Sequence, residues 1–131
     1  MPRDGSPSIT RYRARFFHDW SSGWLWADNG ETRRVFGPTI DHHQLRLPPP
    51  LVEELDRLGS WHDRSLNTSN PDYPSPFRQQ ECDAFNQAVA AAFAQLSVEL
   101  GDSWDLVDET RQLAEDRDLD RYMRDPRTFR R

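Results

Sequence analysis

The stretch PFRQQECDAFNQAVAAAFAQLSVELG, residues 76–101, carries the clearest structural signal in this sequence. Its large apolar side chains recur every three or four residues, the spacing that places them on one face of a helix. This stripe consists of Phe85, Val89, Phe93, Leu96 and Leu100. Pro76 suits the first turn of a helix, and Gly101 suits the position after the last turn. We therefore expect a long helix over residues 76–100.

Strand patterns lie on both sides of this helix. Residues 11–16 alternate arginine with Tyr12, Ala14 and Phe16, which is typical of a half-buried strand with a basic outer face. Residues 24–27 (WLWA) predict a second strand, in which Trp24 and Trp26 would share a face, either in the core or toward a partner. The pair Asn29-Gly30 favours a tight hairpin turn, followed by a third strand over residues 32–36. After the long helix, residues 104–109 predict a final strand.

A second, shorter helix is predicted between these groups. Three prolines at positions 48–50 precede Leu51, Leu55 and Leu58 at helical spacing, and Gly59 would end the helix. The expected fold class is α+β, in the order β-β-β-α-α-β. An antiparallel sheet, formed by a three-stranded N-terminal meander plus a C-terminal strand, would be packed by two helices. Residues 1–8 would be a flexible lead, residues 9–110 a single domain, and residues 111–131 a charged tail, weakly helical or disordered.

Composition limits the classes of partner. The chain has 131 residues, no lysine, a single cysteine and a net charge of −5. Residues 51–110 hold 12 acidic residues against 3 arginines, a balance of −9. This acidity argues against nucleic acid as the principal ligand and favours a basic protein partner, such as a toxin. No signal peptide or membrane-spanning run is visible, so a cytoplasmic location is expected, with no membrane partner.

Few residues suggest chemistry. His42 and His43 follow Asp41, but adjacent side chains normally point in different directions, so no metal site is predicted. His62 and Asp63 are also neighbours, without a recognisable nucleophile. We expect no catalytic residue and no cofactor. Two alternatives stay open: a small enzyme or accessory subunit using His62 or the His42-His43 pair, and a structural or assembly subunit of a phage or secretion particle.

Binding is the function that remains. The loop over residues 67–77 is rich in proline, which reduces the entropy lost when a loop binds a partner. Carboxylates flank this loop, and Trp20 lies in a predicted turn where it would be exposed. The residues that we expect to bind a partner are Asp56, Asp63, Asp72, Tyr73, Glu81, Asp83 and Trp20.

Four segments also carry a resemblance. They are residues 20–29 (WSSGWLWADN), residues 61–67 (WHDRSLN), the prolines at 71, 74 and 76 followed by Phe77, and the pair Leu100-Gly101. With these motifs, residues 9–109 resemble a group of small actinobacterial-type proteins that look like immunity or antitoxin partners. The resemblance implies a protein-binding role. It assigns no functional residue, and residues after Thr110 lie outside it.

Overall fold

The computed structural model describes residues 10–20 and 22–131, so the lead predicted over residues 1–8 lies outside the described residues. The strands are β1 (Tyr12–Asp19), β2 (Gly23–Ala27), β3 (Thr39–Ile40) and β4 (Trp104–Asp108). The helices are α1 (Gly30–Phe36), α2 (Pro49–Asp63), α3 (Gln79–Leu100) and α4 (Leu119–Arg124). Short 3₁₀ turns occupy His42–Gln44 and Gly101–Ser103. No helix in this part of the chain is long and apolar enough to cross a membrane.

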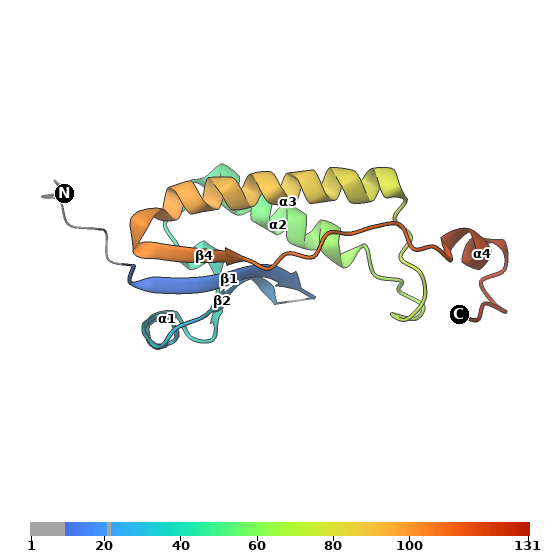
Figure 1. Ribbon diagram of the computed structural model, residues 1–131, viewed down its shortest axis with the longest axis horizontal. Coiled ribbons are helices and arrows are strands. Elements are labelled where there is room, and N and C mark those ends of the chain that lie inside the picture. The colour runs from blue at the N-terminus through green and yellow to red at the C-terminus, as the bar shows by residue number, and fades with distance from the viewer. Residues whose placement is uncertain (1–9, 21) are drawn as a thin grey trace, which may run out of the picture.

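The four strands form one mixed sheet in the order β3-β2-β1-β4. β1 pairs antiparallel with β2 and β2 with β3, but β4 pairs parallel with β1. The α+β class and the added C-terminal strand are confirmed, whereas the wholly antiparallel sheet is wrong. The reason lies in α3, which carries the chain back along the sheet before β4 starts, so that β4 runs in the direction of β1 (Figure 1).

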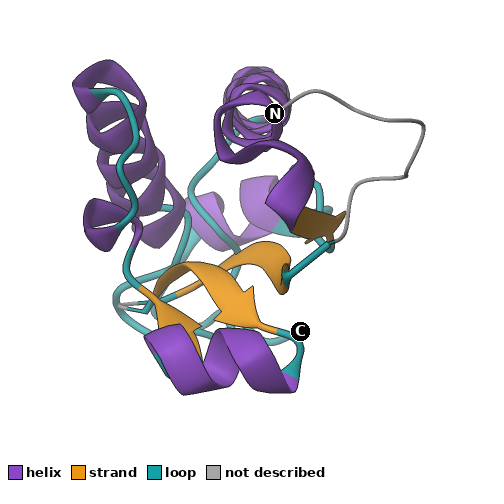
Figure 2. Cartoon of the chain, turned by 90° about the vertical axis from the view of Figure 1, so that its left-hand side faces the viewer, coloured by secondary structure: helices purple, strands orange, loops and turns teal. Residues whose placement is uncertain are grey.

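The third strand of the expected meander is also wrong. Residues 30–36 form α1, and the Asn29 side chain caps this helix by accepting hydrogen bonds from the Thr32 amide (2.9 Å) and the Thr32 hydroxyl (2.6 Å). Asn29 has a φ of −152°, which is extended backbone and not the positive φ of the expected hairpin. The element order is therefore β-β-α-β-α-α-β-α. Figure 2 shows α1 across the sheet from the two long helices.

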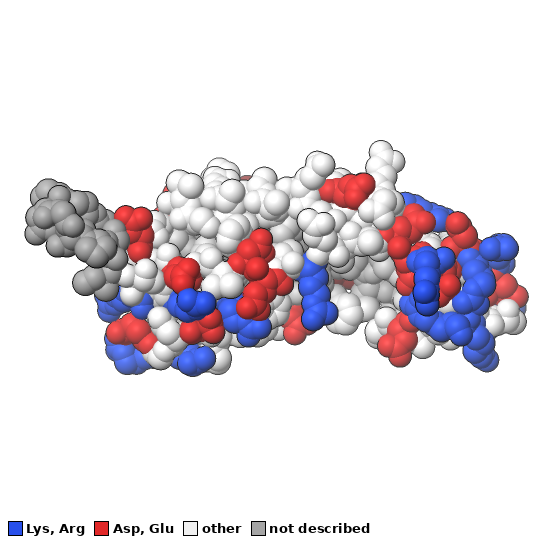
Figure 3. All heavy atoms as spheres, in the orientation of Figure 1, with Lys and Arg blue, Asp and Glu red and all other residues white. Residues whose placement is uncertain are grey.

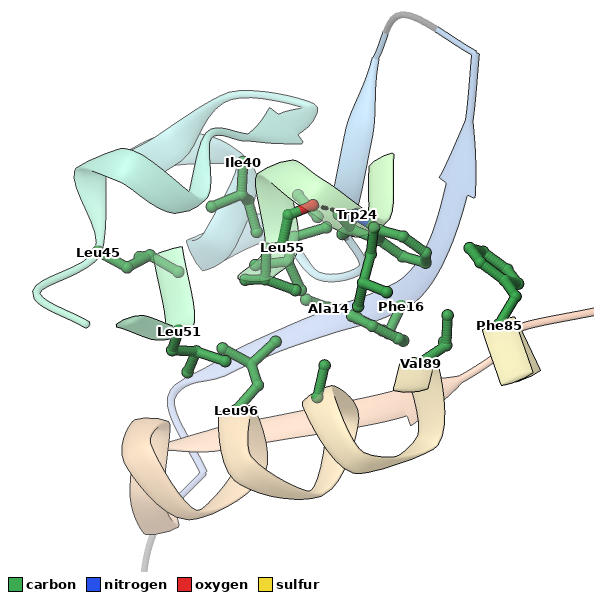
Figure 4. Packing of buried hydrophobic residues seen from close by; sticks show 14 residues of the cluster. Ala14, Phe16, Trp24, Ile40, Leu45, Leu51, Leu55, Phe85, Val89 and Leu96 are labelled. Atoms are coloured by element: carbon green, nitrogen blue, oxygen red, sulfur yellow. Dashed lines mark hydrogen bonds between the residues drawn. The ribbon is translucent and has the colours of Figure 1, made fainter. Parts of the chain in front are cut away.

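The core lies between the sheet and the pair α2 and α3, which pack side by side (Figure 4). Trp24 is 1% exposed, stacks on Phe16, and donates a hydrogen bond from its indole nitrogen to the Leu55 carbonyl (3.0 Å). Trp26 instead stacks on Phe17 and is half-buried. The two tryptophans therefore do not share a face, contrary to the strand pattern.

An irregularity in the strand pairing explains this difference. Phe16 pairs with Leu25 and Asp19 with Gly23, so two residues of β1, Phe17 and His18, lie opposite Trp24 alone. Such a bulge breaks the alternation of side chains and increases the local twist. Trp24 consequently faces inward next to Leu25, and His18, which continues the alternation of Ala14 and Phe16, lies beside it with ring centroids 4.8 Å apart.

Helix α2 does not end at Gly59, as its sequence suggested, but continues to Asp63. Gly59 is buried, and a Cβ at this position would lie 3.1 Å from Cε1 of His18. The glycine thus gives the His18 ring space against the helix. In the tail, residues 119–124 form α4, and Leu119 and Phe129 are buried.

Candidate partner-binding site

A cleft of about 530 Å³ opens between α2 and the segment joining β2 to the 3₁₀ turn at His42. Asp56 and Asp63 both line it, because they lie seven residues apart, two helical turns, on the same face of α2. The described lining contains three aspartates and three histidines and no arginine: Asp41, Asp56, Asp63, His18, His42 and His43. The histidines and aspartates form two separate clusters.

The first cluster gathers around Asp56. Nε2 of His42 lies 2.8 Å from one Asp56 oxygen, and Nε2 of His43 lies 2.9 Å from the other. The two imidazoles stack with centroids 4.3 Å apart, so the 3₁₀ turn brings adjacent side chains onto one side, contrary to the expectation that they would diverge. His43 also hydrogen-bonds through Nδ1 to Asp41 (2.7 Å). Both ring nitrogens of His43 therefore face carboxylates.

These contacts set the electrostatics of the first cluster. The hydrogen bond to Asp41, and then that to Asp56, raises the pKa of His43. The backbone N–H of His43, followed by its side chain, lowers the pKa of Asp41. Burial alone would raise the pKa of Asp56, but its hydrogen bonds with His43 and His42 lower it. These contacts favour the imidazolium form of His43, which lies between two carboxylates.

The second cluster joins the β1 bulge to the last turn of α2. Nε2 of His18 lies 3.1 Å from Oδ1 of Asp63, and Nδ1 of His62 lies 3.7 Å from the same oxygen. The His18 and His62 rings meet edge to face with centroids 4.6 Å apart. Burial, and then the neighbouring His18, lowers the pKa of His62. Trp20, 43% exposed, lies beside this cluster, its ring centroid 6.4 Å from that of His62.

The structure separates the predicted partner-binding residues into three groups. The first group consists of Asp56 and Asp63, which line the cleft, and Trp20. The Trp20 ring lies beside the ring of His62, which precedes Asp63 in the sequence. On the first turns of α3, Glu81 accepts a hydrogen bond from the Trp61 indole, and Asp83 accepts one from Gln79.

Asp72 and Tyr73 form the third group, and they contact the C-terminal tail. The guanidinium of Arg131 donates to the Asp72 carbonyl (2.9 Å), and the Tyr73 ring packs against Tyr122 and Phe129. In Figure 3, arginine and acidic side chains are interleaved around α4, whereas the surface over α3 is largely uncharged.

Sequence reasoning did not select His18, which lies in β1 and not in the expected turn over residues 18–23. The sequence does contain a signal for it. Ala14, Phe16 and His18 are spaced two residues apart, so a strand extended by two residues would have placed His18 on the inner face with the other two. Cys82 is buried, and burial followed by the charge of Asp83 raises the pKa of its thiol.

Comparison with protein families places this sequence in a known group. The family model described as Serratia CdiI immunity protein-like matches residues 13–107, from β1 into β4. A comparison with curated proteins gives no match. The immunity part of the sequence resemblance is thus supported, while nothing supports the actinobacterial assignment. Because the family model covers most of the chain, this protein belongs to the Serratia CdiI immunity protein-like family.

Proposed function

We propose that this protein binds a toxin, and that the acidic cleft beside α2, together with Trp20, forms the surface that docks onto it. Family membership implies a toxin partner and a binding role. The observation that carries the location is the cleft itself, whose described lining combines three aspartates with no arginine. The partner surface would accordingly be basic.

The carboxylates of the cleft are accessible to a partner. The side chains of Asp56 and Asp63 are 49% and 43% exposed, although each contacts histidine. Those contacts fix the orientation of the oxygens and leave part of each carboxylate open to solvent. Arginine or lysine side chains of a toxin would pair with them through charge-assisted hydrogen bonds, which are stronger than neutral ones.

Trp20 would supply the apolar anchor. Interfaces concentrate their binding energy in a few residues, and tryptophan is enriched among them. Trp20 is held at the turn between β1 and β2, where its amide donates to the Asp19 carboxylate (2.9 Å). Glu81 and Asp83 would extend the docking edge along α3, and Asp72 and Tyr73 would form its outer limit against the tail.

The test begins with identification of the partner, captured with the tagged chain from its native host. Its affinity is then measured by calorimetry for wild type, Asp56→Arg, Asp63→Arg and Trp20→Ala. We expect Trp20→Ala to cost about 2 kcal/mol, roughly thirtyfold in Kd. Each charge reversal should weaken binding and reduce its dependence on salt.

Glu99→Arg is the matched control, because Glu99 is an exposed carboxylate near the far end of α3. It should leave the affinity unchanged. Circular dichroism confirms that each variant is folded. If both aspartate reversals bind the partner as wild type does, with the same salt dependence, the cleft is not the docking surface.

A further inference from the structure

Three side chains from two distant parts of the sequence meet at the end of α2. His18 comes from the β1 bulge, while His62 and Asp63 come from the last turn of the helix. Each offers one nitrogen or oxygen donor, and these donor atoms all lie within 4.8 Å of one another. Two imidazoles and a carboxylate are the donor set that divalent first-row transition metals accept.

Each of the two histidines also has a buried ring nitrogen without a hydrogen-bond partner. The His18 side chain is only 6% exposed, and its Nδ1 has no hydrogen-bond partner. Nδ1 of His62 is likewise buried without a hydrogen bond. Buried polar atoms in native proteins almost always have a partner, so the unpaired Nδ1 of His62, the ring nitrogen on the side of Asp63, calls for a specific explanation. A bound ion would supply a partner for Nδ1 of His62, which faces Asp63 without bonding it.

The spacing of the donors agrees with a metal site. Zinc binds imidazole nitrogen and carboxylate oxygen at about 2.0–2.2 Å, so neighbouring ligands of a tetrahedral zinc lie roughly 3.3 Å apart. The observed separations from Oδ1 of Asp63 are 3.1 Å to His18 and 3.7 Å to His62. These two separations lie on either side of that value, and the two imidazole nitrogens lie within 4.8 Å of each other, so side-chain movements of an ångström or so would bring all three donors to tetrahedral spacing.

We infer that His18, His62 and Asp63 form a binding site for a divalent transition-metal ion, which links the β1 bulge to the end of α2. Asp63 is partly exposed and gives the ion access from solvent. A fourth position, open toward the cleft, would take water.

The other histidine pair is less suited to this role. Nε2 of His42, and both ring nitrogens of His43, bond carboxylate oxygens at 2.7–2.9 Å, whereas in the proposed site only Nε2 of His18 makes such a bond, at 3.1 Å. An ion there would have to break this satisfied network. The pair His42 and His43 therefore serves as the matched control, since the chain contains only four histidines.

The experiment uses the full-length chain, freed of metal with a chelator and titrated with Zn²⁺ by calorimetry and with Co²⁺ by visible absorption. Wild type should bind one ion per chain, with the d–d bands of a tetrahedral site, and zinc should raise its melting temperature. His62→Gln and Asp63→Asn should each lower the affinity at least about tenfold. The double variant His42→Gln/His43→Gln should bind as wild type does.

Two results would overturn the inference. One is the absence of saturable Zn²⁺ and Co²⁺ binding by folded wild type. The other is binding that survives in both His62→Gln and Asp63→Asn, or that is lost in the His42→Gln/His43→Gln variant. Because the titration uses the isolated chain, its outcome is independent of whether the cleft docks a toxin.

Discussion

The four histidines of this chain show how far the surroundings of a residue decide its chemistry. His43 is half exposed and lies between Asp41 and Asp56, so its charged form is favoured. His62 is mostly buried beside another imidazole, so its neutral form is favoured. Each of the two has an aspartate within two residues in the sequence. Only their three-dimensional surroundings explain why their pKa values shift in opposite directions.

His43 should therefore stabilise the fold in a pH-dependent way. Its pKa is raised above the ordinary value of 6.5, so the folded chain holds this proton more tightly than the unfolded chain. The stabilisation is complete below about pH 6.5 and is lost as the pH rises through the raised pKa. We expect the difference in unfolding free energy between wild type and His43→Gln, measured by urea denaturation, to shrink as the pH rises above about 6.5.

His62→Gln provides the opposite sign as a control. The pKa of His62 is lowered, so the unfolded chain binds this proton more tightly, and wild type gains stability relative to His62→Gln as the pH rises toward about 6.5. At the acid end, Asp41 has a lowered pKa, and its contribution is lost as the pH falls through that value. A difference between wild type and His43→Gln that does not vary with pH would contradict the imidazolium arrangement.

At the scale of elements, the capping of α1 by Asn29 is the contact that replaces the expected hairpin. Its Oδ1 accepts from the Thr32 amide and hydroxyl, and its Nδ2 donates to the Arg11 carbonyl (3.3 Å). Asn29→Ala should lower the free energy of unfolding by about 1–2 kcal/mol, measured by chemical denaturation. Asn29→Asp keeps the capping oxygen and should lose less. Equal losses in the two variants would mean that the cap does not stabilise α1.

The same residue shows why part of the fold could not be predicted. An Asn-Gly pair suits both a hairpin and a helix start, and the choice here depends on the Thr32 hydroxyl, which accepts from the Arg13 amide of β1 (2.9 Å). The α3 stripe and the β1 alternation were predictable, because side-chain spacing reports them directly. The parallel pairing of β4 was not, because the path of α3 decides it.

The candidate site was predictable in its residue types but not in its assembly. Negative charge singled out Asp56 and Asp63, and a turn position singled out Trp20. These residues come close to His18 only because of the β1 bulge and the space left by Gly59, and both are tertiary features. Likewise, the convergence of His42 and His43 on one carboxylate requires the 3₁₀ turn. No local pattern encodes these contacts.

At the scale of the whole molecule, the tail largely balances its own charge. Arg131 pairs with Asp116 and Asp118, and Arg78 of the preceding loop pairs with Asp120. Arg121 also pairs with Asp118, whereas the described lining of the acidic cleft contains no arginine. The tail also lies beyond the residues matched by the family model, which end at position 107. This C-terminal segment packs onto the loop before α3 and onto α3 itself, where the Asn86 side chain exchanges two hydrogen bonds with the Leu113 backbone.

This C-terminal segment should open independently of the domain. Phe129 is 3% exposed and packs against Tyr73 (5.4 Å) and Tyr122 (5.3 Å), in a cluster separate from the main core. Phe129→Ala should lower the free energy needed to open the tail by about 3 kcal/mol. This change raises the population of the open tail roughly a hundredfold. Trypsin, which cleaves after arginine, should then cut residues 111–131 correspondingly faster, while the melting temperature of the domain stays nearly unchanged. Met123→Ala, on the exposed side of α4, is the control and should leave cleavage as in wild type. If Phe129→Ala instead lowers the stability of the whole chain by the same amount, the tail and the domain unfold as one cooperative unit.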